Sequence, residues 1–175
     1  AARFDFVKLE NINGHYIREA DPTYLYNVMV ETAREVGREN DVTGLTANHN
    51  TVLAALPELQ PRAKTVLELI DLAQFIYALR PIQPDAAAAA LLTDDAKLVL
   101  AGIAETLGGL ADWSVPAIDA AMRSLAEEKG LKLGKLAQPL RAALTGRTVS
   151  PGIFEVMVLI GREESMARLS DQIGG

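Results

Sequence analysis

The sequence contains no cysteine and only two histidines, His15 and His49. Without cysteine the chain can form no disulfide bond, no thiolate metal site and no thiol nucleophile, which is compatible with a reducing compartment. Two histidines provide few ligands for a metal ion, so we expect no metal site in this chain.

Long apolar segments are also absent. No run approaches the roughly 20 consecutive apolar residues that a membrane-spanning helix needs, and the first residues, AARFDFVK, lack the apolar core and the cleavage pattern of a signal peptide. We therefore expect a cytoplasmic protein without a membrane partner. The sequence does not begin with Met, and we expect it to be a piece of a longer protein.

The residues that are present favour a helical, globular fold. Of 175 residues, 49% are hydrophobic and 23% charged, a composition typical of soluble folded domains. Apolar residues recur at helical spacing almost throughout, and the alternation typical of strands is scarce. The sequence therefore predicts an all-α protein of two small helical bundles in tandem, residues 1–80 and 81–175. We place the boundary at Arg80-Pro81, because the residue before a proline is pushed out of the helical region.

Capping residues and apolar periodicity set the expected helices. They are expected at residues 23–36, 50–59, 61–80, 94–107, 114–130, 133–144, 152–160 and 163–172. Residues 38–46 are polar, and we expect them to form a hinge. Pro139 falls inside one of these helices, where it removes a backbone hydrogen bond, so we expect a kink or a break there.

The charge of the chain is unevenly distributed. Residues 129–154, which we call the basic window, contain five basic residues and no acidic one, although the whole chain has a formal charge of −6. The remaining residues carry 12 basic and 23 acidic side chains, a net charge of −11. Arginines, a glycine-bearing loop and a helix start together suit a phosphate or a base edge. The alternative is that these cations only complement helix dipoles.

Two segments of the chain carry a specific resemblance. EEKGLKLGKLAQPLRAALTGRTVSPGIFEVMVLIGREESMARL, residues 127–169, resembles the C-terminal end of bacterial glutamyl-tRNA synthetases, with its pattern Q-P-L-R-x-A-L-T-G followed by S-P-G-x-F-E and L-G-x-E. FDFVKLENINGHYIREAD, residues 4–21, resembles the stem-contact segment that follows the catalytic domain in the same family. Between them we match only the helical pattern and Pro61-Arg62.

The resemblance implies two superhelical anticodon-binding subdomains of the class I type. The stem-contact segment and the first anticodon-binding subdomain would occupy residues 1–80, and the second would occupy residues 81–175. In the family, the arginine that matches Arg141 lies at the first anticodon base, and residues matching Ser150 and Ile153 lie beside it. Arg62 matches the arginine at the third base. The remaining cations, Lys132, Lys135 and Arg147, would then hold the RNA backbone.

The family's ATP-binding motifs, H-I-G-H and K-M-S-K-S, do not occur in this sequence. We therefore expect no catalytic residue and no cofactor in this chain, and no activity from it alone. ATP would bind in the parent enzyme's catalytic domain, which would also be a partner within the same polypeptide. The resemblance implies tRNA for Glu as the RNA partner, leaves open whether tRNA for Gln is also bound, and leads us to expect a monomer.

Two other functions fit an all-α chain. A free-standing interaction module of the same fold could dock its basic face on an acidic protein, and the reading frame upstream of Ala1 would distinguish it from a ligase. A helix-turn-helix DNA-binding protein is disfavoured by the acidic net charge and by the lack of a basic recognition helix.

Overall fold

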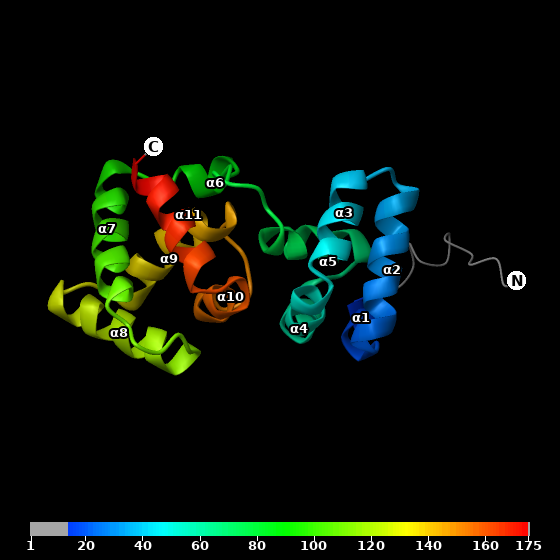
Figure 1. The fold of residues 1–175 in the computed structure, drawn as a ribbon, viewed down its shortest axis with the longest axis horizontal. Coiled ribbons are helices and arrows are strands. Elements are labelled where there is room, and N and C mark those ends of the chain that lie inside the picture. Colours follow the sequence, from blue (N-terminus) through cyan, green and yellow to red (C-terminus); the bar gives the residue numbers. More distant parts are fainter. Residues whose placement is uncertain (1–13, 175) are drawn as a thin grey trace, which may run out of the picture. The chain divides into compact units, whose positions relative to one another are not determined.

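The computed structural model describes residues 14–174, and these residues form helices joined by turns, without a strand. The chain divides into two compact units. Along the sequence the division falls between Tyr77 and Ala78, three residues before the expected boundary. Figure 1 labels the α-helices of both units.

The first unit is built around one amphipathic helix, α2. Asp21 caps α2, accepting a hydrogen bond from the Tyr24 amide at 3.0 Å, and Pro22 occupies its first position. Helix α2 packs against α3, α4 and α5, and α1 contacts the short 3-10 helix η2. The helices of this unit are α1 (Gly14–Glu19), α2 (Pro22–Glu35), α3 (Glu39–Ala47), α4 (His49–Leu59), η2 (Gln60–Arg62), α5 (Val66–Ala73) and η3 (Gln74–Ile76).

The expected hinge at residues 38–46 is wrong, because α3 covers most of it. This polar helix contains a buried carboxylate, because Asp41 is 6% exposed. The Asp41 carboxylate accepts hydrogen bonds from Arg38 at 2.5 Å, from Tyr77 at 2.7 Å and from Gln74 at 3.1 Å. The Tyr77 ring also lies so close to Gly44 that a Cβ atom there would overlap it. Contacts made far along the chain therefore hold this helix in place.

The expected long helix over residues 61–80 is also interrupted. Pro61 lies in η2, Ala63 is extended, and Thr65 caps the separate helix α5 by accepting a hydrogen bond from the Glu68 amide at 3.1 Å. The described structure of this segment is therefore two short 3-10 helices on either side of one α-helix.

The second unit packs α7, α9 and α11 against one another, with α8 against α7 and α9 and with α10 against α8 and α11. Ser114 and Thr93 cap α8 and α7, as their sequence positions predict. The helices are α6 (Ala86–Ala89), α7 (Asp94–Gly108), α8 (Val115–Glu128), α9 (Leu133–Thr145), α10 (Ile153–Ile160) and α11 (Arg162–Gly174). The core between them is lined by fully buried apolar side chains, among them Leu100, Ile103, Leu107, Ile118, Met122, Leu140, Val156, Met157 and Leu169.

Helix α9 continues through Pro139, so the expected break is wrong. Pro139 is buried, and so are Leu136 and Leu140 next to it. Burial of these apolar side chains offsets the hydrogen bond that the proline removes.

Candidate nucleic-acid interface

The basic window lies in the second unit and runs from the end of α8 to the start of α10. Its central element is α9, in which Leu136, Leu140 and Leu144 form a row of fully buried side chains. Lys135 and Arg141 are displaced from this row; Lys135 is exposed and Arg141 is partly exposed. This arrangement follows from the helical spacing of the three leucines.

Arg141 is tied to the loop that precedes α10. Its Nε atom donates a hydrogen bond to the Ser150 hydroxyl at 2.9 Å, and that hydroxyl donates to the Pro151 carbonyl at 2.7 Å. An arginine held through Nε keeps its planar head in one orientation, with the two terminal nitrogens forming the fork that recognises carboxylates, phosphates and base edges. The structure therefore brings together two of the residues predicted for the site.

A glycine turn joins α9 to that loop. Gly146 ends α9 with a φ of 69°, in the left-handed region, and its carbonyl accepts a hydrogen bond from the Asp85 amide at 2.9 Å. The Thr145 hydroxyl donates to the Arg141 carbonyl at 2.8 Å and accepts from the Arg147 amide at 3.2 Å. These hydrogen bonds hold the backbone that leads into Arg147.

Arg147 itself makes an ion pair that the sequence did not predict. Its Nη1 atom lies 3.6 Å from Asp85 Oδ2, and the two side chains are 53% and 38% exposed. Asp85 also caps α6, because its Oδ1 accepts from the Ala88 amide at 2.8 Å. An exposed pair of this kind contributes about 0 to 1 kcal/mol, so it can give way to another anion.

The lysines distinguish between the two explanations of the basic window. Lys132 is the N-cap residue of α9 and Lys135 lies in its first turn, where the helix dipole disfavours positive charge. Among residues 14–174 no carboxylate forms a salt bridge with either side chain. Lys129 and Arg147 follow the ends of α8 and α9, where the dipole does favour them. Dipole complementarity therefore does not account for Lys132 and Lys135.

Apolar residues at this site differ from the prediction. Ile153 is the first residue of α10 and only 4% exposed, so most of its side chain belongs to the core. Val149, next to Ser150, is 65% exposed. Val149 was not among the predicted site residues, since apolar periodicity does not show which loop residue faces solvent.

Arg62 lies in the other unit, at the end of η2. Its Nη1 atom donates to the Glu58 carbonyl at 2.7 Å and lies 3.9 Å from the carboxylate of the same residue, and its side chain is 37% exposed. The guanidinium thus satisfies a carbonyl at the end of α4. Part of the arginine remains accessible to a ligand.

Most of the predicted stem-contact segment lies outside the described residues. His15 and Tyr16, in α1, are exposed, and their rings pack edge to face with centroids 5.8 Å apart. His49 is the first residue of α4 and is exposed, and its ring packs edge to face with that of Tyr26, with centroids 4.4 Å apart. Trp113 has a structural role, because its indole Nε1 donates to the Met157 carbonyl at 3.0 Å.

No group of three or more His, Asp or Glu side chains suited to a metal ion occurs within residues 14–174. None of the helices in that range is long and apolar enough to cross a membrane.

Comparison with known proteins gives a consistent result. The family model described as "Anticodon binding domain" matches residues 23–173. The glutamate–tRNA ligase 2 of Rhizorhabdus wittichii is 51% identical over 174 residues, which are 99% of this chain and 36% of that protein. The glutamate–tRNA ligase 1 of Brucella melitensis is 49% identical over 176 residues, which cover 99% of this chain and 37% of that protein. This chain thus spans little more than a third of the curated relatives it matches.

Solved structures show the same fold at lower sequence identity. The structure of a glutamate tRNA ligase from Elizabethkingia meningosepticum matches with a TM-score of 0.72 and 23% identity, over 99% of this chain and 33% of that one. A glutamate–tRNA synthetase from Elizabethkingia anophelis matches with a TM-score of 0.69 and 23% identity, over the whole of this chain and 33% of that one.

Proposed function

We propose a function for this chain on the premise that it belongs to the family of anticodon-binding domains. In this function, the chain binds tRNA for Glu and recognises the anticodon of that tRNA, as the C-terminal region of a ligase that joins glutamate to it. The relatives named above, which bear the name glutamate–tRNA ligase, support this choice of tRNA.

The observation that carries the proposal is the guanidinium of Arg141, which lies in α9 and is restrained by Ser150, together with the exposed cations of the basic window. Bases of a single-stranded RNA loop are splayed out and read on their exposed edges. Arg141, oriented by Ser150 through a 2.9 Å hydrogen bond, can present two parallel donors to the first anticodon base. The exposed Val149 can pack against a base face, and the few exposed atoms of Ile153 add at most a minor contact.

The remaining cations hold the RNA without reading its sequence. Lys132 and Lys135 extend from the start of α9 and contact phosphates as point charges. Arg147 exchanges its exposed ion pair with Asp85 for a phosphate. In the first unit, Arg62 contacts the third anticodon base with the part of its guanidinium that Glu58 leaves accessible.

Catalysis belongs to the part of the ligase that this chain does not contain. ATP binds in that catalytic domain, so the 175-residue chain needs no cofactor and forms no aminoacyl-adenylate by itself. We place the protein in the cytoplasm, as a monomer, with the catalytic domain of the same polypeptide and tRNA as its partners.

Fluorescence anisotropy tests this function directly. We expect the chain to bind tRNA for Glu more tightly than an unrelated tRNA and more tightly than a tRNA for Glu whose anticodon is changed. Transcripts of tRNA for Gln in the same titration measure whether that tRNA is also accepted. Equal affinity for all transcripts, or tighter binding to an acidic polypeptide, would contradict the proposal and favour a protein-interaction module.

A further inference from the structure

A buried arginine in the second unit takes no part in the proposed RNA contacts. Arg168, in the middle of α11, is 1% exposed and is among the largest fully buried side chains of the described residues. Burial of a guanidinium is costly unless its donors are paired. The partners of Arg168 therefore indicate what this charge does in the fold.

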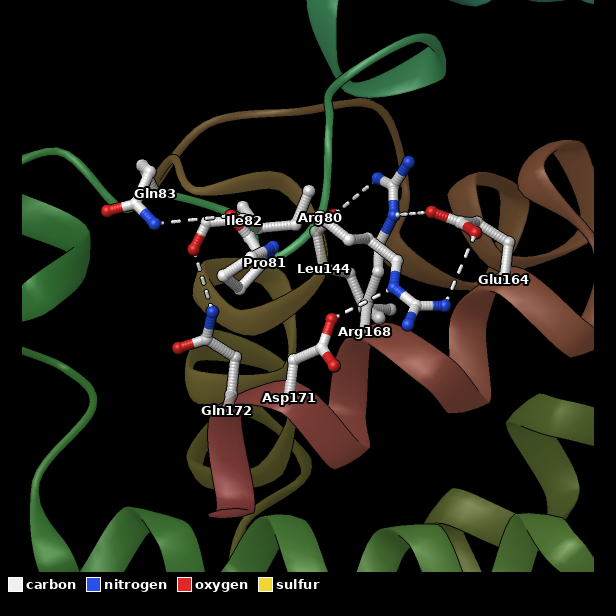
Figure 2. A network of polar contacts seen from close by, with 9 residues as sticks. All are labelled: Arg80, Pro81, Ile82, Gln83, Leu144, Glu164, Arg168, Asp171 and Gln172. Carbon is white, nitrogen blue, oxygen red and sulfur yellow. Dashed lines mark hydrogen bonds and ion pairs between the residues drawn. The ribbon is translucent and has the colours of Figure 1, made fainter. Parts of the chain in front are cut away.

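One partner lies at the end of the helix that carries Arg141. Arg168 Nη1 donates to the Leu144 carbonyl at 2.8 Å, and Nε donates to Glu164 Oε1 at 2.7 Å, as Figure 2 shows. The last carbonyls of a helix have no partner inside the helix. Arg168 supplies one for α9 at the residue that directly precedes Thr145 and Gly146.

The same helix, α11, also contacts residues 80–82, which lie near the start of the second unit. Arg80 Nε lies 2.9 Å from Asp171 Oδ2, and Arg80 Nη1 lies 4.0 Å from Glu164 Oε2. Gln172 Nε2 donates to the Ile82 carbonyl at 2.8 Å (Figure 2). Glu164 thus faces both the buried arginine and the arginine near the surface.

The two segments held by α11 meet at the glycine turn. The Gly146 carbonyl accepts a hydrogen bond from Asp85, and a Cβ atom on Gly146 would lie 2.8 Å from the Gln83 carbonyl oxygen. Asp85 in turn faces Arg147. The position of the turn therefore depends on both the end of α9 and the segment at residues 80–85.

We infer that Arg168 is a positioning residue for anticodon recognition, an inference that rests on the function proposed above. Its hydrogen bond to Leu144 fixes the end of α9, and the Glu164–Arg80–Asp171 chain fixes the segment packed beside it. Together they set the turn from which Arg147 and the loop to Ser150 extend, although Arg168 itself does not touch RNA. Base discrimination, more than adhesion, then depends on this buried charge.

The test replaces Arg168 by Met, which fills a similar volume without donors, and uses Arg123→Met as the control. Arg123 pairs with Asp119 on the surface of α8, so its loss changes the net charge equally but leaves the network intact. We expect R168M to lower the ratio of affinities for cognate and first-base-altered anticodon hairpins at least about fivefold, the lower range for one bidentate base contact. The salt dependence should stay as in the wild type, because the lysines are unchanged, and R123M should alter neither.

Hydrogen exchange tests the positioning without RNA. In R168M the amides of Gly146 and Asp85 should exchange about tenfold faster relative to amides in the middle of α7, the effect of losing one hydrogen bond to a charged group. Uniform acceleration of all amides would overturn the inference, as would unchanged base discrimination in a folded R168M. If the wild-type chain binds no tRNA while this local acceleration occurs, the proposed function and the role of Arg168 in anticodon recognition are both wrong, although Arg168 still holds the turn as described.

A second variant decides the matter if R168M does not fold. Arg80→Met removes the exposed end of the same network. The Arg80 side chain is 41% exposed, so the R80M protein is expected to fold. It should accelerate exchange at the Asp85 amide and reduce discrimination less than R168M does. An R80M protein that matches the wild type in both measurements would overturn the inference.

Discussion

Arg141 and Ser150 are joined by a 2.9 Å hydrogen bond from Nε to the hydroxyl oxygen, so one side chain in the middle of a helix is oriented by the loop that follows that helix. The bond uses the one guanidinium nitrogen that lies outside the terminal fork. We therefore expect the two residues to act as a unit, in which Ser150 orients the guanidinium that Arg141 would present to a base.

Arg141→Lys should lose discrimination at the first anticodon base while keeping most of its affinity. A lysine keeps the charge but cannot donate two parallel hydrogen bonds, and one such bidentate contact discriminates by about 1 to 3 kcal/mol. Binding of cognate and first-base-altered hairpins measures the ratio. Full discrimination by the lysine variant would mean that Arg141 contributes charge alone.

Ser150→Ala should give an intermediate loss, because Arg141 remains but its Nε loses a partner that is worth about 1 kcal/mol. The same two hairpins provide the measurement. In the Arg141→Lys background the serine substitution should have no further effect on discrimination, and additive losses would show that the two residues act independently.

Arg62→Gln should reduce discrimination at the third anticodon base and leave the first unaffected. The guanidinium of Arg62 also binds the Glu58 carbonyl, so some loss of stability is expected as well. Hairpins altered at each base separately, measured with thermal unfolding of the same variant, distinguish the two effects. Arg34→Gln is the control, since Arg34 forms an exposed pair with Glu31 elsewhere in this unit.

Reversal of Lys132 and Lys135 to Glu should weaken binding to all RNAs about equally. If each lysine neutralises one phosphate, the slope of log affinity against log salt should fall by about 0.7 to 0.9 per lysine. A titration series across salt concentrations measures it. Reversal of Arg34 and Arg123 gives the same change in net charge, and an equal effect of that control would mean that only total charge matters.

Gly146→Ala should destabilise the second unit by about 2 to 4 kcal/mol, because it combines a left-handed backbone with a clash against the Gln83 carbonyl. Gly130→Ala is the matched control: its φ is 62° and no atom lies within 4 Å of the new Cβ, so only the backbone cost of about 1 to 2 kcal/mol applies. Urea unfolding of both variants gives the difference. Equal destabilisation would show that the turn relaxes away from residues 82–83.

Asp41→Asn should cost about 2 kcal/mol of stability at neutral pH, since it weakens the bonds of a buried carboxylate to Arg38, Tyr77 and Gln74. Burial alone raises the pKa of Asp41, but the hydrogen bonds from these three side chains and the charge of Arg38 together hold that pKa below its usual value. A lowered folded-state pKa means that this stabilisation is complete above the unfolded value of about 3.9 and is lost as the pH falls through the folded value.

Urea unfolding from pH 7 down to pH 2 should therefore show the difference between wild type and Asp41→Asn shrinking below about pH 4. Asp71→Asn is the control, because Asp71 pairs with the same Arg38 but its side chain is 52% exposed, so its loss should cost at most about 1 kcal/mol. A difference that stays constant with pH would show that the charge of Asp41 is not what the site requires.

Local sequence predicted those elements whose stability is local. The leucine row of α9 and the caps Asp21, Thr93 and Ser114 lie where spacing and side-chain chemistry put them. Helix α3 was missed because part of its support is distant: besides the neighbouring Arg38, its buried carboxylate accepts hydrogen bonds from Gln74 and Tyr77, which follow α5. The break considered at Pro139 does not occur, since packing of its neighbours outweighs a local penalty, and the kink stays a prediction.

The candidate site shows the same division. The charge of the basic window and the exposure of Lys135 follow from sequence and helical geometry. The pairing of Arg147 with Asp85 and the support of Leu144 by Arg168 join segments far apart in the chain, so no local pattern reveals them. Ile153 was selected by resemblance, and only the packed structure shows how little of its side chain reaches solvent.

The overlap that any side chain at Gly44 would make with the Tyr77 ring sets a rule for substitution at these two positions. As long as an aromatic ring occupies position 77, only glycine fits at position 44. A larger residue at position 44 requires a smaller one at position 77. A smaller residue at 77 also removes the hydroxyl that binds Asp41, so the exchange has to extend to a third position. Related sequences should therefore vary at 41, 44 and 77 as a set, and a change at one of them alone marks a destabilised protein.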